Sequence, residues 1–432
     1  MSERKLKNNA SWEIIFEKEK IIEQIKSDGF FYISSSKINE QREARLMTKF
    51  DHGVQLPKIF RDNGLSIQPV SRGKYIIGAF KSYFKLPKKS STDIHYLNLP
   101  SHIETLNPNS IYSESSAILC AFLSGMVDDV LGEEVEFTVF GRMSTGIFDY
   151  QIQNKKTNTS QTISVTNSQC EIDGGFEGTS KLAIIEAKCQ TVEDFIIRQL
   201  YYPYRLWTSK TKKEVIPVFL SVSNDIFSFY TFRFSKLNIY NSIELVSEHR
   251  YCLSPSDIEI SDIRNILEST KIVPEPEKIP FPQADIFPRI IDLLGRLYHV
   301  DKPISKDKIT LIYAFNVRQT DYYVSAATYL GLISKEQKNK CEIIYSLSPK
   351  GYFIMTQHPR NKNLALVECI LSHKIFNLSL RNHLENAQMP TLEDIVNIMR
   401  QQSEKKYSDK TLERRAQTVR AWVDWILKLT LI

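Results

Sequence analysis

Cysteine is scarce in this sequence, and its placement excludes the usual cysteine-based frameworks. The 432 residues include six cysteines, and no two of them form a Cys-x-x-Cys pair. Cysteines scattered in this way indicate neither a zinc site nor a set of disulfides. The sequence therefore predicts a protein of a reducing compartment, the cytoplasm.

Long apolar runs are also missing. No apolar stretch approaches the roughly 18 residues that a membrane span needs. Residues 1–13, MSERKLKNNASWE, are charged where a signal peptide would be apolar. We therefore expect a soluble, intracellular protein.

The motifs of some common enzyme classes are absent too. The sequence contains no G-x-x-x-x-G-K-[ST] phosphate loop, no G-x-S-x-G elbow and no H-E-x-x-H pair. These absences argue against NTP-driven, serine-hydrolase and zincin chemistry. No internal repeat is evident.

The composition is that of a globular protein with more than one domain. Hydrophobic residues make up 42% and charged residues 25% of the chain, as in ordinary soluble proteins. A chain of this length predicts about two to four domains. The net charge of +6 favours a polyanionic partner, although many proteins of similar charge have none.

One stretch near the middle of the chain stands out because it combines apolar strands with isolated charges. Residues 163–188 read ISVTNSQCEIDGGFEGTSKLAIIEAK, which predicts two strands joined by a bend at Gly174 and Gly175. The bend would bring Asp173, at the end of the first strand, beside Glu186 on the second. Two carboxylates are therefore expected to lie close together.

The second strand adds a lysine to this pair. Side chains alternate between the two faces of a strand, so Glu186 and Lys188 share a face with the apolar residues Leu182 and Ile184. Burying charge is costly unless the charges pair or bind a metal. The alternative is a hairpin that carries an ordinary surface salt bridge.

Two acids and a lysine at one point suit phosphodiester cleavage. Adjacent carboxylates repel each other unless a cation neutralises them, and Mg²⁺ accepts such oxygen ligands while keeping waters that leave room for phosphate. We expect Asp173 and Glu186 to hold the metal and Lys188 to orient or deprotonate the attacking water.

The spacing Asp173-x12-Glu186-x-Lys188 resembles the PD-(D/E)xK nuclease superfamily, and the surrounding chain resembles a type II restriction endonuclease. Ile172 stands where that superfamily usually has proline. The resemblance implies an α/β (α+β) fold with a mixed central sheet, Mg²⁺ as cofactor and double-stranded DNA as substrate. It also implies a homodimer and a cognate DNA methyltransferase as functional partner.

A helix before the hairpin offers a further ligand. Residues 113–132, SESSAILCAFLSGMVDDVLG, predict a helix capped by Ser113. In the superfamily such a helix often lends a carboxylate to the metal, and Glu114 is the candidate here. Alternatively, Glu114 only complements the helix dipole. Arg198 and Gln199, on the helix after the hairpin, could reach the site, but we expect a packing role for them.

Basic residues in the N-terminal region are candidates for DNA contact. They recur among apolar residues at intervals that suit phosphate and base contacts, and the segments around them resemble those of some restriction endonucleases. The alternative for each is a solvated surface. The candidates are Arg42, Arg45, Arg72 and Lys74.

The C-terminal part predicts two DNA-reading helices after a proline-rich linker. Three helices and a hairpin resemble a winged helix, in which Arg318, Gln319 and Thr320 open the recognition helix. A later helix-turn-helix pattern carries Arg414 and Arg415 outside. The alternatives are protein contacts for the first and a packing helix for the second.

The sequence thus predicts a type II restriction enzyme, with a transposase-like or repair nuclease, or a non-catalytic winged-helix regulator, as alternatives. The expected parts are an N-terminal DNA-contacting region (1–100), the nuclease core (101–255), a linker (256–288), a winged helix (289–360) and a helix-turn-helix-like domain (361–432).

Overall fold

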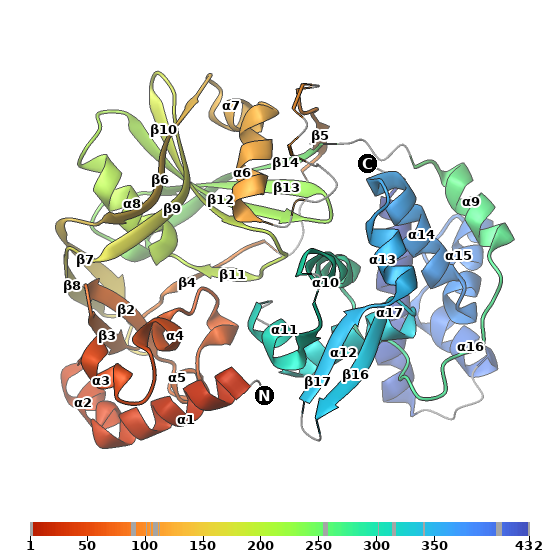
Figure 1. The fold of residues 1–432 in the computed structure, drawn as a ribbon, viewed down its shortest axis with the longest axis horizontal. Coiled ribbons are helices and arrows are strands. Elements are labelled where there is room, and N and C mark those ends of the chain that lie inside the picture. Colours follow the sequence, from red (N-terminus) through yellow and green to blue (C-terminus); the bar gives the residue numbers. More distant parts are fainter. Residues whose placement is uncertain are drawn as a thin grey trace.

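The fold is known from a computed structural model. It describes residues 3–87, 92–100, 102, 103, 105, 106, 111, 113–253, 258–300, 302–312, 317–339, 342–402 and 408–430. The expected mixed α/β class is confirmed, with mixed sheets and a helical C-terminal part. Figure 1 shows the N-terminal and central parts on one side and the C-terminal part on the other, with α10 (Phe287–Val300) at their boundary.

The N-terminal part packs helices against a five-stranded sheet of order β1-β3-β2-β8-β7. Trp12, Phe16 and Phe60 meet edge to face in its core. The sheet includes β7 and β8 from the central part of the chain, so the two parts share a sheet. The elements are α1 (Glu3–Lys18), α2 (Ile21–Asp28), β1 (Phe30–Ser34), α3 (Ser35–Asn39), α4 (Ala44–Thr48), η1 (Gly53–Gln55), α5 (Lys58–Asp62), β2 (Ser66–Ser71), β3 (Lys74–Gly78), β7 (Ile147–Gln153) and β8 (Ser160–Thr166).

The central sheet has seven strands in the order β5-β14-β13-β12-β10-β9-β6. Strand β10 runs parallel to β12 and antiparallel to β9, so the sheet is mixed, as predicted. A separate short ladder joins β4 to β11. The strands are β4 (Tyr83–Lys85), β5 (Ile94–Tyr96), β6 (Glu136–Ser144), β9 (Gln169–Glu177), β10 (Lys181–Lys188), β11 (Asp194–Ile196), β12 (Glu214–Ser223), β13 (Ile226–Phe234) and β14 (Ile243–Cys252), with η2 (Tyr240–Ser242) between the last two.

Strand β10 is buried on both faces, and its alternation is as predicted. Ala183 and Ile185 pack in one core with α6 (Glu114–Leu123) and α7 (Met126–Leu131). Leu182 and Ile184 pack on the other face, with side chains of α8 (Arg198–Thr208). A central strand with apolar neighbours on both sides explains the nearly continuous apolar run.

The predicted bend at Gly174 and Gly175 is wrong, because both glycines lie inside β9, which continues to Glu177. Their role is close packing: a Cβ added at Gly175 would lie 2.6 Å from Cβ of Val139 on the neighbouring strand, and one at Gly174 would lie 3.0 Å from Cγ2 of Ile118 on α6. The chain turns back after Glu177 instead.

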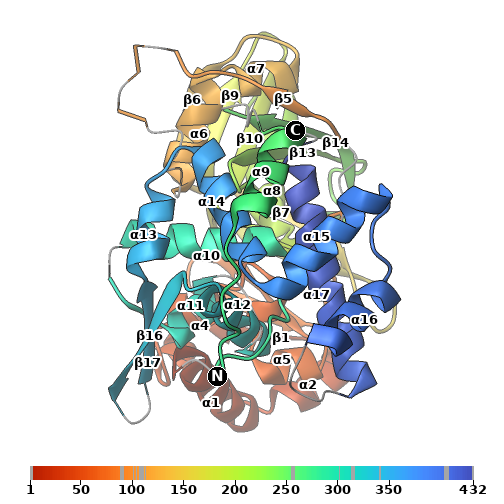
Figure 2. The same cartoon turned by 90° about the vertical axis from the view of Figure 1, so that its right-hand side faces the viewer.

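The expected linker contains a helix that the sequence analysis did not predict, α9 (Ile260–Ser269). Its Ile263 and Leu267, together with Phe281 further along, belong to the C-terminal core. Figure 2 shows this stretch crossing the face of the C-terminal helices. Proline here keeps the chain extended while it stays packed.

The C-terminal part begins with the predicted order of three helices and a hairpin, followed by five helices. A three-stranded sheet pairs β15-β17-β16. No helix among the described residues is long and apolar enough to cross a membrane. The elements are α10, β15 (Ile304–Ser305), α11 (Lys306–Ile312), α12 (Val317–Tyr329), β16 (Ile333–Asn339), β17 (Glu342–Leu347), α13 (Pro349–Met355), α14 (Pro359–Leu371), α15 (Lys374–Asn386), α16 (Leu392–Gln402) and α17 (Asp409–Lys428).

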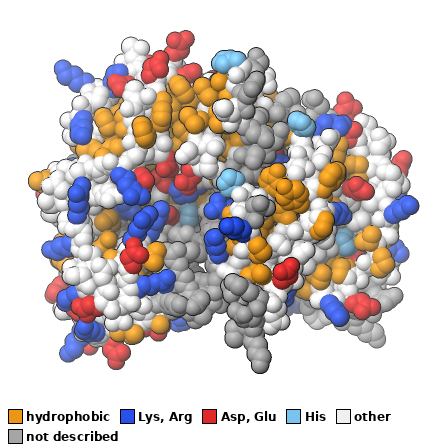
Figure 3. All heavy atoms as spheres, in the orientation of Figure 1, with side chains coloured by type: hydrophobic (Ala, Val, Ile, Leu, Met, Phe, Trp, Pro, Cys, Tyr) orange, Lys and Arg blue, Asp and Glu red, His pale blue; other side chains and the backbone are white. Residues whose placement is uncertain are grey.

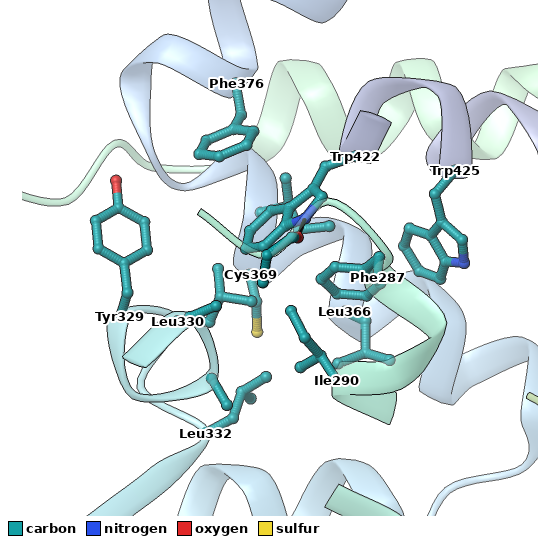
Figure 4. Packing of buried hydrophobic residues seen from close by; sticks show 14 of the residues in the cluster. Phe287, Ile290, Tyr329, Leu330, Leu332, Leu366, Cys369, Phe376, Trp422 and Trp425 are labelled. Atoms are coloured by element: carbon teal, nitrogen blue, oxygen red, sulfur yellow. Dashed lines mark hydrogen bonds between the residues drawn. The ribbon is translucent and has the colours of Figure 1, made fainter. Parts of the chain in front are cut away.

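Trp422 of α17 lies at the centre of the C-terminal core (Figure 4). Its ring stacks on Phe376 with centroids 5.0 Å apart and meets Phe287 edge to face at 5.0 Å. Its Nε1 donates to the carbonyl of Ala284, 2.7 Å away. Trp422 and Trp425 both pack inward, and α10 is fixed to α17 through Phe287.

Candidate active site

Asp173 and Glu186 lie side by side where β9 and β10 separate. The two strands pair from Glu177 opposite Leu182 to Gly174 opposite Ile185. Beyond that point the Oδ2 atom of Asp173 accepts the backbone N–H of Ala187 at 2.9 Å. The carboxylate thus replaces a backbone partner, which fixes it next to the side chain of Glu186.

Lys188 joins the two acids to Glu114. Its Nζ donates to Oε1 of Glu186 at 2.5 Å and to Oε1 of Glu114 at 3.1 Å. Gln199 of α8 also donates to Oε1 of Glu186. The structure therefore brings together Asp173, Glu186 and Lys188 as predicted, and the start of α6 places Glu114 beside them.

The three carboxylates of this cluster are more than the single ammonium of Lys188 can neutralise. Burial raises the pKa of Glu186 to about 8, with the charge of Asp173 acting in the same direction. Burial likewise raises the pKa of Asp173. Burial alone would lower the pKa of Lys188, but the carboxylates of Glu186 and Glu114 outweigh it and raise it well above its usual value. The cluster therefore attracts a further cation or a proton.

The carboxylates fit a magnesium ion that keeps part of its water shell. In the described part of the chain, no three His, Cys, Asp or Glu side chains gather closely enough to form a complete cage, because the ammonium of Lys188 lies between Glu114 and Glu186. Mg²⁺ needs only one or two carboxylates besides waters and phosphate. Oδ1 of Asp173 and Oε2 of Glu186 accept no hydrogen bond from the described residues, so each remains available to a metal.

The cluster opens into a cavity of about 1020 Å³. All three parts of the chain line it. Figure 3 shows Lys and Arg side chains on both sides of the hollow between the two halves of the molecule. The basic residues around the cavity are Arg45, Lys49, Arg72, Arg142, Lys188, Arg198 and Arg296. The same lining holds the acids Asp51, Glu114, Glu171, Asp173, Glu186 and Asp292. The cavity therefore places basic side chains, which suit an anionic group, around acids that suit a cation.

The predicted N-terminal contacts divide into two groups. Arg45 and Arg72 line the cavity. Arg42 does not; its guanidinium donates to Oδ1 of Asn8 at 2.8 Å and so joins α1 to the following segment. Lys74 lies over the ring of Tyr32, 4.7 Å from its centroid, also away from the cavity lining.

Two residues that were predicted to contact DNA from the C-terminal helices have buried side chains. Thr320 is fully buried, and its hydroxyl bonds to that of Thr310 at 2.8 Å. Arg415, expected outside, is 7% exposed and lies over the ring of Phe281. Neither side chain can reach a base from these positions.

Two of the other predicted contacts on these helices, Arg414 and Gln319, lie at or near the surface. Arg414 is exposed and stacks over the ring of Tyr322 on α12, 5.0 Å from its centroid. Gln319 is half-buried in the first turn of α12. Arg318 lies in the same turn, and its side chain is outside the described part of the structure.

Sequence reasoning missed several cavity residues. It favoured packing over a place at the site for Arg198 and Gln199 and assigned no role to Arg142, yet all three line the cavity. It also missed His52, whose Nδ1 donates to the carbonyl of Asp194 at 2.5 Å. The one available signal was the position of Arg198 and Gln199 at a helix start shortly after Lys188.

Models of three protein families match successive parts of the chain, and residues from all three parts line the cavity. The model of the family described as Domain of unknown function (DUF6996) matches residues 9–77. Two further models with the same kind of description, Domain of unknown function (DUF6997) and Domain of unknown function (DUF7226), match residues 78–252 and 289–431. Each part of the chain matches a different family. Arg45 and Arg72 fall in the first match, the acidic cluster in the second and Arg296 in the third. No match was found among the curated proteins or among the solved structures.

Proposed function

We propose that this protein is a Mg²⁺-dependent endonuclease that cuts double-stranded DNA, most similar to the type II restriction enzymes of the PD-(D/E)xK superfamily. The observation that carries the proposal is the cluster itself: Asp173, Glu186 and Lys188 meet at the end of two adjacent strands and face an arginine-lined cavity. Buried charges of this kind are costly for a domain that only binds DNA. This cost disfavours a non-catalytic regulator.

Each residue of the cluster has a distinct role in this proposal. Asp173 and Glu186 would hold the metal, which when bound would make hydroxide available near neutral pH. Glu114, which the ammonium of Lys188 separates from Glu186, would add its negative charge to the site. Gln199 fixes the orientation of the Glu186 carboxylate through its hydrogen bond. The ammonium of Lys188 orients the attacking water and stabilises the negative charge that develops on the phosphate. Water attacks directly, so no covalent enzyme intermediate forms.

The C-terminal part supports sequence-specific binding. The order α10, β15, α11, α12, β16 and β17 is typical of a winged helix, in which the helix before the hairpin enters the major groove. Exposed Arg414 of α17 lies beside α12. We propose a homodimer acting in the cytoplasm beside a cognate DNA methyltransferase.

Plasmid cleavage tests this function. Purified protein should nick or linearise plasmid DNA with Mg²⁺ and not with EDTA. Asp173→Asn should slow cleavage by more than the roughly 10- to 100-fold that loss of an outer-shell partner costs. Glu177→Gln is the matched control, because Glu177 lies on the same strand and pairs with Lys213 at 2.7 Å outside the cavity. Equal cleavage by wild type and Asp173→Asn would contradict the proposal.

A further inference from the structure

Helix α10 of the C-terminal part is docked on the segment that directly follows the catalytic strand. The carboxylate of Asp292 is buried and accepts the backbone N–H of Thr191 at 3.1 Å and the hydroxyl of Ser223 at 2.9 Å. Arg289, one turn earlier, donates to Glu193 at 2.9 Å. Thr191 comes three residues after Lys188, so these contacts fix α10 relative to the acidic cluster.

Arg296 follows Asp292 by four residues and therefore lies on the same face of α10. This position places it in the lining of the catalytic cavity. Its Nε atom is buried and makes no hydrogen bond to the described residues. Arg198 also lines the cavity, and its Nε is likewise buried without a hydrogen-bond partner among the described residues.

These two arginines differ from the other cations near the cluster. Lys188 is paired with Glu186 and Glu114, Arg142 with Glu171, and Lys49 lies 3.8 Å from Asp51. Among the residues that the structure describes, Arg198, Arg296, Arg45 and Arg72 line the cavity without an ion-pair partner, but of these only Arg198 and Arg296 also hold a buried Nε without a hydrogen-bond partner. Buried donors without partners are rare in native proteins. Two arginines of one cavity lining that each keep such a donor indicate a missing anion.

We infer that Arg296 and Arg198 together bind a phosphodiester group of the DNA backbone in the catalytic cavity. This inference rests on the proposed function and extends it: the C-terminal part supplies a residue of the active site as well as any base-reading surface. A guanidinium is suited to the role because it presents several donors to phosphate oxygens in a fixed plane. The complete substrate site then exists only while α10 is docked through Asp292 and Arg289.

Binding measured without cleavage tests this inference. Anisotropy of a short fluorescein-labelled duplex, in Ca²⁺ and at several salt concentrations, gives both affinity and its salt dependence. Arg296→Ala and Arg198→Ala should each weaken binding and lower the slope of log K against log[salt] by about one. Arg296→Lys, which keeps the charge, should keep the slope. Arg264→Ala, which removes an exposed arginine of α9 outside the cavity, should change neither quantity.

The outcomes separate this inference from the nuclease assignment. Wild-type affinity and slope in Arg296→Ala would overturn the inference and leave the assignment intact. A wild type that binds the duplex through Arg296 but cuts no DNA with Mg²⁺ would overturn the assignment alone. Should Arg296→Ala fail to fold, Arg296→Gln is measured instead and judged by the same slope.

Discussion

The end of strand β10 and the N-terminal halves of helices α12 and α17 all carry polar or charged residues that the sequence marks as functional, yet the structure places them differently. At β10, Glu186 is buried, the side chain of Lys188 is 11% exposed, and both converge with Asp173 and Glu114. On the helices, Thr320 and Arg415 are buried by packing, and Arg414 is exposed. Only the first group forms one cluster.

This difference shows which kind of charge can be interpreted from sequence. Alternation in a strand is strict, so a charge at a core position of an apolar strand must be paired or bound to something. A basic residue in an amphipathic helix carries no such constraint, because a long side chain can lie along apolar surface. The nature of the flanking residues thus decides how far a charge predicts function.

The largest expected effect is at β10. Lys188→Met removes the buried ammonium from between Glu186 and Glu114, which leaves two carboxylates without their cation. We expect a loss of about 3 kcal/mol in the free energy of unfolding together with loss of Mg²⁺-dependent cleavage. Lys181→Met, on the same strand, removes only a bond to the carbonyl of Leu131. Denaturation and plasmid cleavage check both variants. Equal stability and equal cleavage in the two would contradict a special role for the buried ammonium of Lys188.

The contact between the two regions should be sensitive to pH. Burial raises the pKa of Asp292 to about 6, whereas an aspartate in an unfolded chain titrates near about 3.9. The folded protein therefore keeps a proton that the unfolded chain has lost, and this group makes the protein less stable as the pH rises from about 4 to 6. The Asp292→Asn side chain cannot titrate. Between about pH 4 and pH 6 the unfolding free energy of this variant should therefore fall less than that of the wild type, and the difference should reach up to about 3 kcal/mol. Urea denaturation at each pH measures the difference.

Asp424→Asn is the control for this pH dependence, because the side chain of Asp424 is 47% exposed and its ion pair among the described residues is with Lys428. It should follow the wild type. An unchanged pH dependence in Asp292→Asn would show that docking of α10 does not rest on a buried carboxylate.

The smallest expected effects separate two neighbouring arginines of α17. Arg415→Ala removes a buried side chain over Phe281 and should lower stability by about 1–3 kcal/mol without changing DNA affinity. Arg414→Ala should stay within about 0.5 kcal/mol in stability and weaken DNA binding. Denaturation and anisotropy distinguish the two variants. The reverse pattern would place the DNA-binding face of α17 on its buried side.

The sequence predicted the members of the cluster better than their surroundings. Glu186 and Lys188 followed from alternation, and Glu114 followed from the resemblance to the nuclease superfamily. The bend at Gly174 and Gly175 was wrong, since a glycine needed for close packing against Val139 and Ile118 looks in sequence like a glycine needed for a turn.

Arg296 could not be predicted, because it reaches the cavity only through docking of a separate part of the chain. The helix α9 was missed for a related reason: prolines after it suggested an open linker, while Ile263 and Leu267 are buried by helices that come much later in the sequence. Contacts of this kind depend on tertiary packing, which local patterns do not encode.

The central claim is that Asp173 and Glu186 hold the metal ion of the reaction, and iron-directed cleavage of the polypeptide tests it most directly. Fe²⁺ is substituted for Mg²⁺ in the wild type, and ascorbate with peroxide then cuts the backbone next to the bound ion. We predict cuts near residues 114, 173 and 186–188 that excess Mg²⁺ suppresses and that Glu186→Gln abolishes. Cuts elsewhere in the chain, or the same cuts in Glu186→Gln, would contradict the assignment.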